Sequence, residues 1–504
     1  MAFTEQEESK VKAIIAAFDN GKRIADLPLA SGGLEDYMVE VQDAGGESAR
    51  VNLFHAISIV NKKIAIRRWD ETKGTPIGEA YGNIDFLREL PSVLGLGCYL
   101  VTDDRKRRKL DPTNHYKFAD GSPAKLDGTD GQYMWCWNAH YYASWKEGNY
   151  FYEAVSLNPI EGVECYRIPA GGTSALGNAV LDRTANILCS LISDDPRYRG
   201  GGNQASWDGT YRSQLGKPVT AQAMTNCSVN ARRRGEGWES QWYVSRAVQE
   251  YLFRLIMGTR NSQAAFNPEK DANGLYCCGL GAGVTNVGYT QWNEYNGAYP
   301  LIPTSVGVEL GDGVGEAAYD VPNEDGSVFL ATKVPVFFGL KNLYGNLWTG
   351  VRGLIIDAGE EISSVYVAPS LYDNYATDSV AGMIKAAEIY RTESYIKKIS
   401  MNKLCCMPTE PGASTATHYC DYHYVNHNTS QGLRCRLAGG SAYNGALAGA
   451  FVSNSNNTVA TSSSNFSGAL RLPRNYRKRK TLPLGKKPRH QKGISRPFGS
   501  TIPE

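Results

Sequence analysis

Long apolar runs are missing from this 504-residue chain. None approaches the ~18–20 consecutive apolar residues that a membrane-spanning helix requires. The N-terminus also lacks the short apolar core of a secretory signal. We therefore expect a protein made in the cytoplasm, without a membrane partner, that reaches the cell exterior only on a particle or by lysis.

A regular cysteine framework is also missing. The eleven cysteines are odd in number and irregularly spaced, which favours reduced, buried thiols over a set of disulfides. Tyrosine and glycine are abundant instead, at 30 and 53 residues, and this favours a loop-rich β or α+β protein over a helical one. Tyrosine-rich surfaces also suit binding, because the ring offers a large contact area at low entropic cost.

A third absence is local. Residues 432–472 contain no Lys, Glu, Gln, Met or Trp but are rich in Ser, Asn, Ala and Gly. Such a segment forms no core by itself, and a plain Ser/Asn-rich linker is one interpretation. However, its glycines are spaced like turns, and it carries spread apolar anchors: Leu437, Leu447, Phe451, Phe466, Leu470 and Leu472. This pattern is typical of short strands and turns held on a scaffold, with small polar side chains facing outward.

Motifs in and before this segment resemble the C-terminal variable region of proteins diversified by retroelements. The matching elements are Cys420-Asp421-Tyr422, Gly439-Gly440, Gly445-Ala446-Leu447-Ala448-Gly449 and Gly468-Ala469-Leu470-Arg471-Leu472. Two positions depart from the family pattern: Leu470 stands between Ala and Arg of the closing motif, and Ala442 stands where many members carry Trp. In that family a C-type lectin fold displays hypervariable residues, as in phage tropism determinants. Its adenine-directed mutagenesis converts Asn codons into a set that omits the same five residue types.

Two upstream stretches resemble the formylglycine-generating-enzyme branch of the same fold. Residues 342–348 (NLYGNLW) resemble its Asn-x-x-Gly-Asn-x-Trp signature. Residues 231–263 resemble it through Gly235, Gly237 and Trp238, a long helix, and then Asn261-Ser262-Gln263. Together the resemblances imply an α+β chain with a C-terminal C-type lectin-like fold, preceded by a β-rich region and a terminal helix.

The expected organisation has four parts. An amphipathic N-terminal helix within residues 1–24 serves attachment or packs on its own domain, and a β-rich domain follows over 25–125. The lectin-like domain covers 126–472, with 432–472 as its variable region. The tail, 473–504, is strongly basic although the whole chain has a net charge of only +2. It is expected to be disordered in isolation and to bind nucleic acid, dock on an acidic partner or simply aid solubility.

Three further segments have clear local patterns. The aromatic stretch 133–152 predicts strands packed on both faces, although an aromatic sugar-binding platform is an alternative. Helical spacing of apolar residues predicts a helix over Gln241–Met257, ended by Gly258. The basic run RKRRK at 105–109 is interpreted as a solvated loop.

The resemblance implies a receptor-binding component of a phage tail or fibre rather than an enzyme. Its expected partners are a host bacterial surface receptor (protein or glycan) and other virion proteins, and a homotrimer is implied. No cofactor or metal is expected. The expected ligand-binding residues are His423, His427, Tyr443, Asn444, Ala446, Leu447, Ala450, Ser453, Asn454, Asn456, Asn457, Ser462, Ser464 and Asn465.

Other readings stay open. A cysteine oxidase of the formylglycine-generating type would use Cys420 and Cys435 as its pair. A bacterial surface-display member of the same family would carry a signal or lipobox. The cluster of His418, Cys420, His423 and His427 has no recognisable metal-ligand spacing, and residues 418 and 423 would face opposite sides of a strand.

Overall fold

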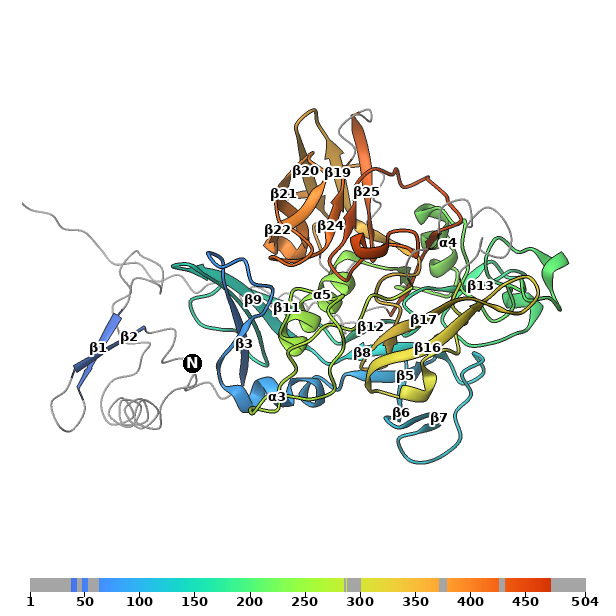
Figure 1. Cartoon of the computed structure of the whole chain (residues 1–504), viewed down its shortest axis with the longest axis horizontal. Helices are drawn as coiled ribbons and strands as arrows, with labels where there is room; N and C mark the ends of the chain where they lie inside the picture. Colours follow the sequence, from blue (N-terminus) through green and yellow to red (C-terminus); the bar gives the residue numbers. More distant parts are fainter. Residues whose placement is uncertain are drawn as a thin grey trace, which may run out of the picture. The chain divides into compact units, whose positions relative to one another are not determined.

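The computed structural model of the chain describes residues 63–284, 287, 301–370, 379–425 and 431–472, together with the strands at 38–42 and 48–52. The expected N-terminal helix within 1–24, the basic tail 473–504 and His427 lie outside the described residues. The fold is mixed but rich in strands, with three α-helices in the described part (Figure 1). This agrees with the α+β expectation.

The first large sheet is antiparallel and has the strand order β11-β9-β10-β3-β4. Its strands are β3 (Ile64–Asp70), β4 (Glu79–Gly82), β9 (His140–Glu147), β10 (Tyr150–Ser156) and β11 (Cys165–Ile168). Two earlier strands, β1 (Met38–Gln42) and β2 (Ser48–Asn52), form an antiparallel pair of their own. The predicted strands of the aromatic stretch 133–152 are therefore confirmed in β9 and β10.

The second large sheet joins segments from almost the whole described chain, in the order β15-β28-β12-β8-β5-β6-β7. Its strands are β5 (Gly97–Val101), β6 (Arg107–Asp111), β7 (Asn114–Phe118), β8 (Gln132–Trp137), β12 (Gly171–Ser174), β15 (Glu239–Ser240) and β28 (Leu470–Arg471). β5 pairs directly with β8, so the domain boundary expected at 125/126 falls inside this sheet. The solvated loop predicted at 105–109 is also corrected, because part of it belongs to β6.

The third large sheet is built mainly from the C-terminal part of the described chain, in the order β21-β20-β19-β25-β26-β24-β22-β23, with β27 added beside β19. Its strands are β19 (Trp348–Ala358), β20 (Ile362–Val367), β21 (Ile384–Tyr390), β22 (Ser394–Ser400), β23 (Met407–Pro411), β24 (Tyr422–Tyr424), β25 (Gly432–Ala438), β26 (Ser453–Asn454) and β27 (Phe466–Ser467). Residues 432–472 thus supply three strands of this sheet and one of the previous sheet.

Shorter elements complete the fold. β13 (Val180–Asp182) pairs with β14 (Ile187–Cys189), and a three-stranded sheet contains β16 (Val314–Pro322), β17 (Val328–Phe337) and β18 (Leu340–Lys341). The 3-10 turns are η3 (Pro196–Tyr198), η4 (Ala205–Trp207), η5 (Val308–Leu310), η6 (Asn402–Leu404) and η7 (Gly445–Leu447).

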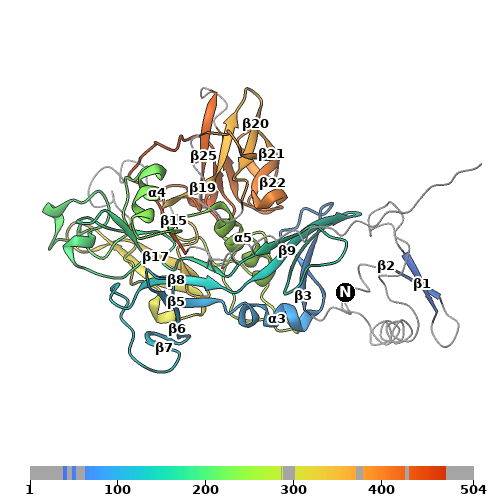
Figure 2. The same cartoon turned by 180° about the vertical axis from the view of Figure 1, so that it is seen from behind.

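The helix α5 (Tyr243–Met257) is central to the fold and every one of its residues is buried. It contacts β3 and β10 of the first sheet, β12 of the second and β19 of the third, and both views show it among them (Figures 1 and 2). Gly258 ends it in the left-handed conformation at φ 67°, so the predicted helix and its stop are confirmed. Two other helices, α3 (Ile84–Val93) and α4 (Met224–Arg232), pack nearby.

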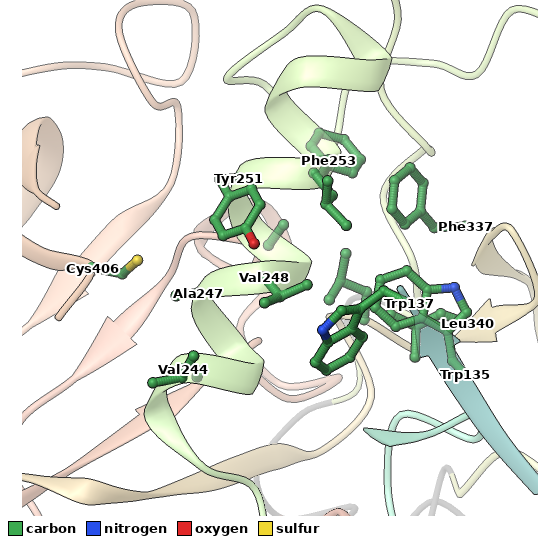
Figure 3. Close-up of a cluster of buried hydrophobic side chains, with 14 of the residues drawn as sticks. Trp135, Trp137, Val244, Ala247, Val248, Tyr251, Phe253, Phe337, Leu340 and Cys406 are labelled. Carbon is green, nitrogen blue, oxygen red and sulfur yellow. The ribbon is translucent and has the colours of Figure 1, made fainter. Parts of the chain in front are cut away.

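The main hydrophobic core lies between α5 and its neighbouring strands. Figure 3 shows Val248 and Phe253 of α5 facing Trp135, Trp137 and Phe337. The rings of Trp135 and Phe337 lie 6.1 Å apart between centroids. All six residues of β8 are buried, because its two faces pack into different apolar clusters. The prediction of strands packed on both faces therefore holds for β8.

Candidate functional site

The two groups of motifs that are far apart in the sequence meet in the structure. The amide of Gly345 donates to the carbonyl oxygen of Gly439 at 3.0 Å, and the amide of Ala442 donates to that of Asn346 at 3.1 Å. An isolated parallel bridge joins Asn346 to Ser441. The Gly-Asn-x-Trp turn therefore supports the Gly439-Gly440 turn of the segment 432–472. Trp348, which ends the motif, is buried.

A second contact connects the Cys-Asp-Tyr motif to the Gly-x-x-Ala-Gly turn. The carboxylate of Asp421 is fully buried and accepts a hydrogen bond from the Phe451 amide at 2.7 Å. A Cβ atom at Gly449 would lie only 1.9 Å from Asp421 Oδ1, so this position requires glycine. Burial raises the pKa of the Asp421 carboxyl well above its ordinary value. The two motifs are thus one structural unit.

Residues of α5 and of the loop after it form hydrogen bonds to the backbone in and next to the Gly-x-x-Ala-Gly turn. The Ser262 hydroxyl accepts a hydrogen bond from the backbone amide of Ala450 at 2.9 Å. The side-chain amide of Gln263 donates to the carbonyl oxygen of Ala446 at 3.2 Å. The guanidinium of Arg246 donates to the carbonyl oxygens of Leu343 and Ala450. Most of these bonds end on backbone atoms of the turn, so they do not depend on which side chains it carries.

A buried charge network ties β25 to α5. Glu250 Oε1 accepts from Arg246 Nε at 2.8 Å and from Arg436 Nη2 at 2.7 Å. All three side chains are buried almost completely. Because a buried charge is stable only when it is paired, this network makes the position of β25 depend on α5.

The outer side of the sheet carries a row of half-buried tyrosines: Tyr395, Tyr422 and Tyr424, the tyrosine row. Neighbouring ring centroids lie 5.3 Å and 4.9 Å apart, and Tyr424 lies 5.7 Å from the ring of Trp348. The Asn444 side chain donates to the Tyr424 hydroxyl at 2.8 Å. The row therefore adjoins the loop of residues 441–447, and it offers aromatic surface and hydroxyl groups together.

The structure divides the expected binding residues into three groups. Exposed residues are Tyr443, Ala446 and Ser462; half-buried residues are Asn444, Leu447, Asn454, Asn456, Asn457, Ser464 and Asn465; and buried residues are His423, Ala450 and Ser453. The first group is accessible to a ligand, and Tyr443 has 51% of its surface exposed.

The buried group is a correction to the sequence analysis. Ala450 and Ser453 are fully buried, because the first lies over Arg246 and Ser262 and the second is a strand residue of β26. His423 lies on the side of β24 opposite to Tyr422 and Tyr424. There it contacts the Ser455 hydroxyl at 3.1 Å and lines a small pocket with Ser394, Ile396 and Pro408. Burial lowers its pKa to about 3, so it is a neutral inward-facing residue.

Several half-buried asparagines shape the loop rather than face a ligand. Asn444 Oδ1 accepts from the amide of Ser441 at 2.7 Å and from its hydroxyl at 3.0 Å. Asn454 Oδ1 accepts from the Asn456 amide at 2.9 Å and from the Asn457 side chain at 3.1 Å. Sequence reasoning missed the tyrosine row, although the spacing Tyr422-x-Tyr424 places both rings on one face of a strand.

The cysteines near the site are buried thiols. All eleven cysteines are free thiols and most are buried, as predicted. Burial raises the pKa of both Cys420 and Cys435 to about 12. In the part of the chain that the structure describes, His418, Cys420 and His423 are not gathered into a metal-binding group.

No protein-family model matches the chain, and no curated protein gives a significant match. None of the described helices has the length and apolar character needed to cross a membrane.

Proposed function

We propose that this chain is a receptor-binding protein of a bacteriophage particle, with a C-type lectin-like fold over residues 126–472. Its ligand surface consists of the exposed side chains of the 441–465 region and the adjoining tyrosine row. One observation carries the proposal: the turn 439–451 is held through its backbone by buried groups of other segments, while Tyr443 and Ala446 face solvent. Side chains on such a turn can change without loss of the fold, and a diversified surface needs this property.

The surface chemistry supports adaptable recognition. Tyrosine provides rigid, amphipathic contact area, and Ser and Asn provide hydrogen bonds that can adjust to different ligands. The tyrosine row would supply the constant part of the contact, and Tyr443, Ala446 and Leu447 the part that varies. Contacts of this kind give modest affinity per copy, and a homotrimer or several copies on one particle would raise it by avidity.

The thiol chemistry argues against an oxidase. A reactive cysteine needs a lowered pKa and access to substrate. Cys420 and Cys435 have the opposite property, because burial raises the pKa of each to about 12. Cys435 also packs inside an apolar cluster with Trp348 and Leu437. A binding role therefore fits these two positions better than thiol oxidation.

The test combines binding with natural variation. Replacing Tyr443, Ala446 and Leu447 together should abolish or redirect adsorption to the host, while the melting temperature stays within a few degrees. The matched control is a triple change at exposed positions outside residues 432–472, Tyr116, Tyr211 and Val328, which should leave adsorption intact.

Sequencing residues 432–472 across a phage population gives an independent readout. Substitutions should concentrate at adenine-containing codons of exposed positions and spare Gly449 and Arg436. Even substitution over all codons and all domains would refute the proposal, as would normal adsorption by the triple variant.

A further inference from the structure

A thiol, an imidazole and a carboxylate from three segments of the chain meet in the structure. All three segments precede residues 432–472. The three groups belong to Cys98 on β5, His115 on β7 and Asp312, which follows η5. One ligand atom from each lies within 4.8 Å of the other two. Cys98 and His115 are fully buried, and the Asp312 side chain is only 8% exposed.

The Asp312 carboxylate is the centre of this cluster and is incompletely satisfied. Its Oδ1 accepts from the Cys98 amide at 2.7 Å and lies 3.0 Å from His115 Nε2. Its Oδ2 is buried and has no hydrogen-bond partner among the described residues. A buried polar atom without a partner destabilises the fold, and more so when it is charged. A cation at this place would remove that cost.

Two glycines let the three groups come this close. A Cβ atom at Gly97 would lie 2.1 Å from Asp312 Oδ2, and one at Gly339 would lie 2.6 Å from Cys98 Sγ. Both residues have positive φ, at 142° and 85°. The backbone thus leaves room for the donor atoms of the cluster where any other residue would displace them.

The imidazole is held in the orientation that a ligand requires. His115 Nδ1 contacts the buried hydroxyl of Tyr133 at 2.6 Å, and this leaves Nε2 directed toward Asp312. Metal-binding histidines characteristically use their second ring nitrogen for such a hydrogen bond, which sets the ring and its tautomer.

We propose that Cys98, His115 and Asp312 bind a structural Zn²⁺ ion, independently of the function of the variable surface. Mixed sulfur, nitrogen and oxygen donors suit zinc, whereas magnesium and calcium require oxygen donors. A thiolate and a carboxylate together balance the charge of the ion. The Cys98 thiol releases its proton to solvent as the zinc–sulfur bond forms. The three side chains would supply three ligands, and a small molecule such as water would complete the four-fold coordination that zinc prefers.

Burial distinguishes this site from a cysteine nucleophile with a His–Asp pair. A nucleophile must reach a substrate, but Cys98 and His115 are closed to solvent, and the Cys98 thiol is directed to the Gly339 carbonyl at 3.5 Å. The ion would instead join two strands of the seven-stranded sheet to the segment between η5 and β16. Its role would be to stabilise that connection.

The experiment uses the full-length protein, purified without chelator or metal-affinity resin. Elemental analysis should find about one zinc per chain, and cobalt substitution should give a thiolate-to-cobalt charge-transfer band. Asp312→Asn and Cys98→Ala should each lose the metal, and Cys98→Ala should also lose the band. Tyr133→Phe should bind zinc about 10-fold more weakly, because it removes only the outer hydrogen bond.

The matched control is Cys136→Ala, which removes a fully buried thiol from β8 of the same sheet but outside the cluster. It should keep both the zinc and the cobalt band. Circular dichroism checks that Asp312→Asn, which keeps the size of the side chain, is folded. A wild-type protein without zinc and without a cobalt band would overturn the proposal. Zinc that persists in folded Asp312→Asn and Cys98→Ala would do the same.

Discussion

The outer and inner sides of the turn 439–451 differ in solvent exposure and in their bonds to the rest of the chain. On the outer side, Tyr443 and Ala446 are exposed. On the inner side, Arg246, Ser262 and Asp421 bind its backbone from buried positions. The comparison shows that the groups holding this short segment in shape belong to other parts of the chain.

The largest effect should follow from removing the carboxylate of Glu250, which pairs with Arg246 on the inner side of the turn. Replacing Glu250 with Ala leaves Arg246 and Arg436 buried without their shared carboxylate, which should cost about 3–5 kcal/mol of folding free energy. Urea unfolding at pH 7 measures the loss. The matched control is Glu410→Ala, which removes a carboxylate paired with two partly exposed lysines and should cost no more than about 1 kcal/mol. Equal losses in the two variants would contradict the distinction.

A smaller, pH-dependent effect should come from His423. Its folded pKa of about 3 lies below the ordinary value of 6.5, because the buried site disfavours the charged ring. As the pH falls below about 6.5, the His423 ring becomes protonated in the unfolded chain but stays neutral in the folded chain. The stability contributed by the neutral ring is therefore lost, by roughly 1.4 kcal/mol per pH unit down to about pH 3.

His423→Asn should reduce this loss. Free energies of unfolding from urea titrations at pH 6.5 and pH 4.5 should differ by about 2–3 kcal/mol less in the variant than in the wild type. Buried His140, whose pKa burial lowers to about 4, stays in both proteins and contributes equally. An unchanged pH dependence would show that His423 is open to solvent and belongs with the outer side after all.

The smallest effect should come from the outer side itself. Tyr443→Ala removes an exposed side chain and should change the free energy of unfolding by less than about 0.5 kcal/mol. Its neighbour Asn444 is the control, because its side chain bonds Ser441 and Tyr424; Asn444→Ala should cost about 1 kcal/mol. Thermal unfolding of both variants tests this order, and a larger loss from Tyr443 would place it among the structural residues.

Much of the scaffold was predictable because its signals are local. The apolar spacing from Val244 to Ile256 and the stop at Gly258 predicted α5, and the density of aromatic residues predicted β8, β9 and β10. The strand β6 was missed because only Leu110 of its five residues is buried and three of the others are basic. A strand with one buried residue shows no alternation of apolar and polar residues, so its sequence carries no strand signal.

The site was predictable only in part, because burial depends on contacts between distant segments. Composition and motifs marked 432–472 correctly as a segment held by a scaffold, but they gave no means of separating Tyr443 from Ala450. That separation comes from Arg246 and Ser262, which precede Ala450 by 204 and 188 positions. The cluster of Cys98, His115 and Asp312 was invisible for the same reason, since 197 positions separate its histidine from its aspartate.

The position of β28 has a consequence for protein synthesis. This strand follows the turn 439–451 in the chain, yet it lies between β12 and β15, where Arg471 pairs with Thr173 and Glu239. The ribosome must therefore translate the whole of residues 432–472 before the seven-stranded sheet can close. A frameshift or premature stop codon anywhere in that stretch removes the closing strand and exposes apolar residues to cellular proteases. Only chains translated through Arg471 can therefore complete the seven-stranded sheet.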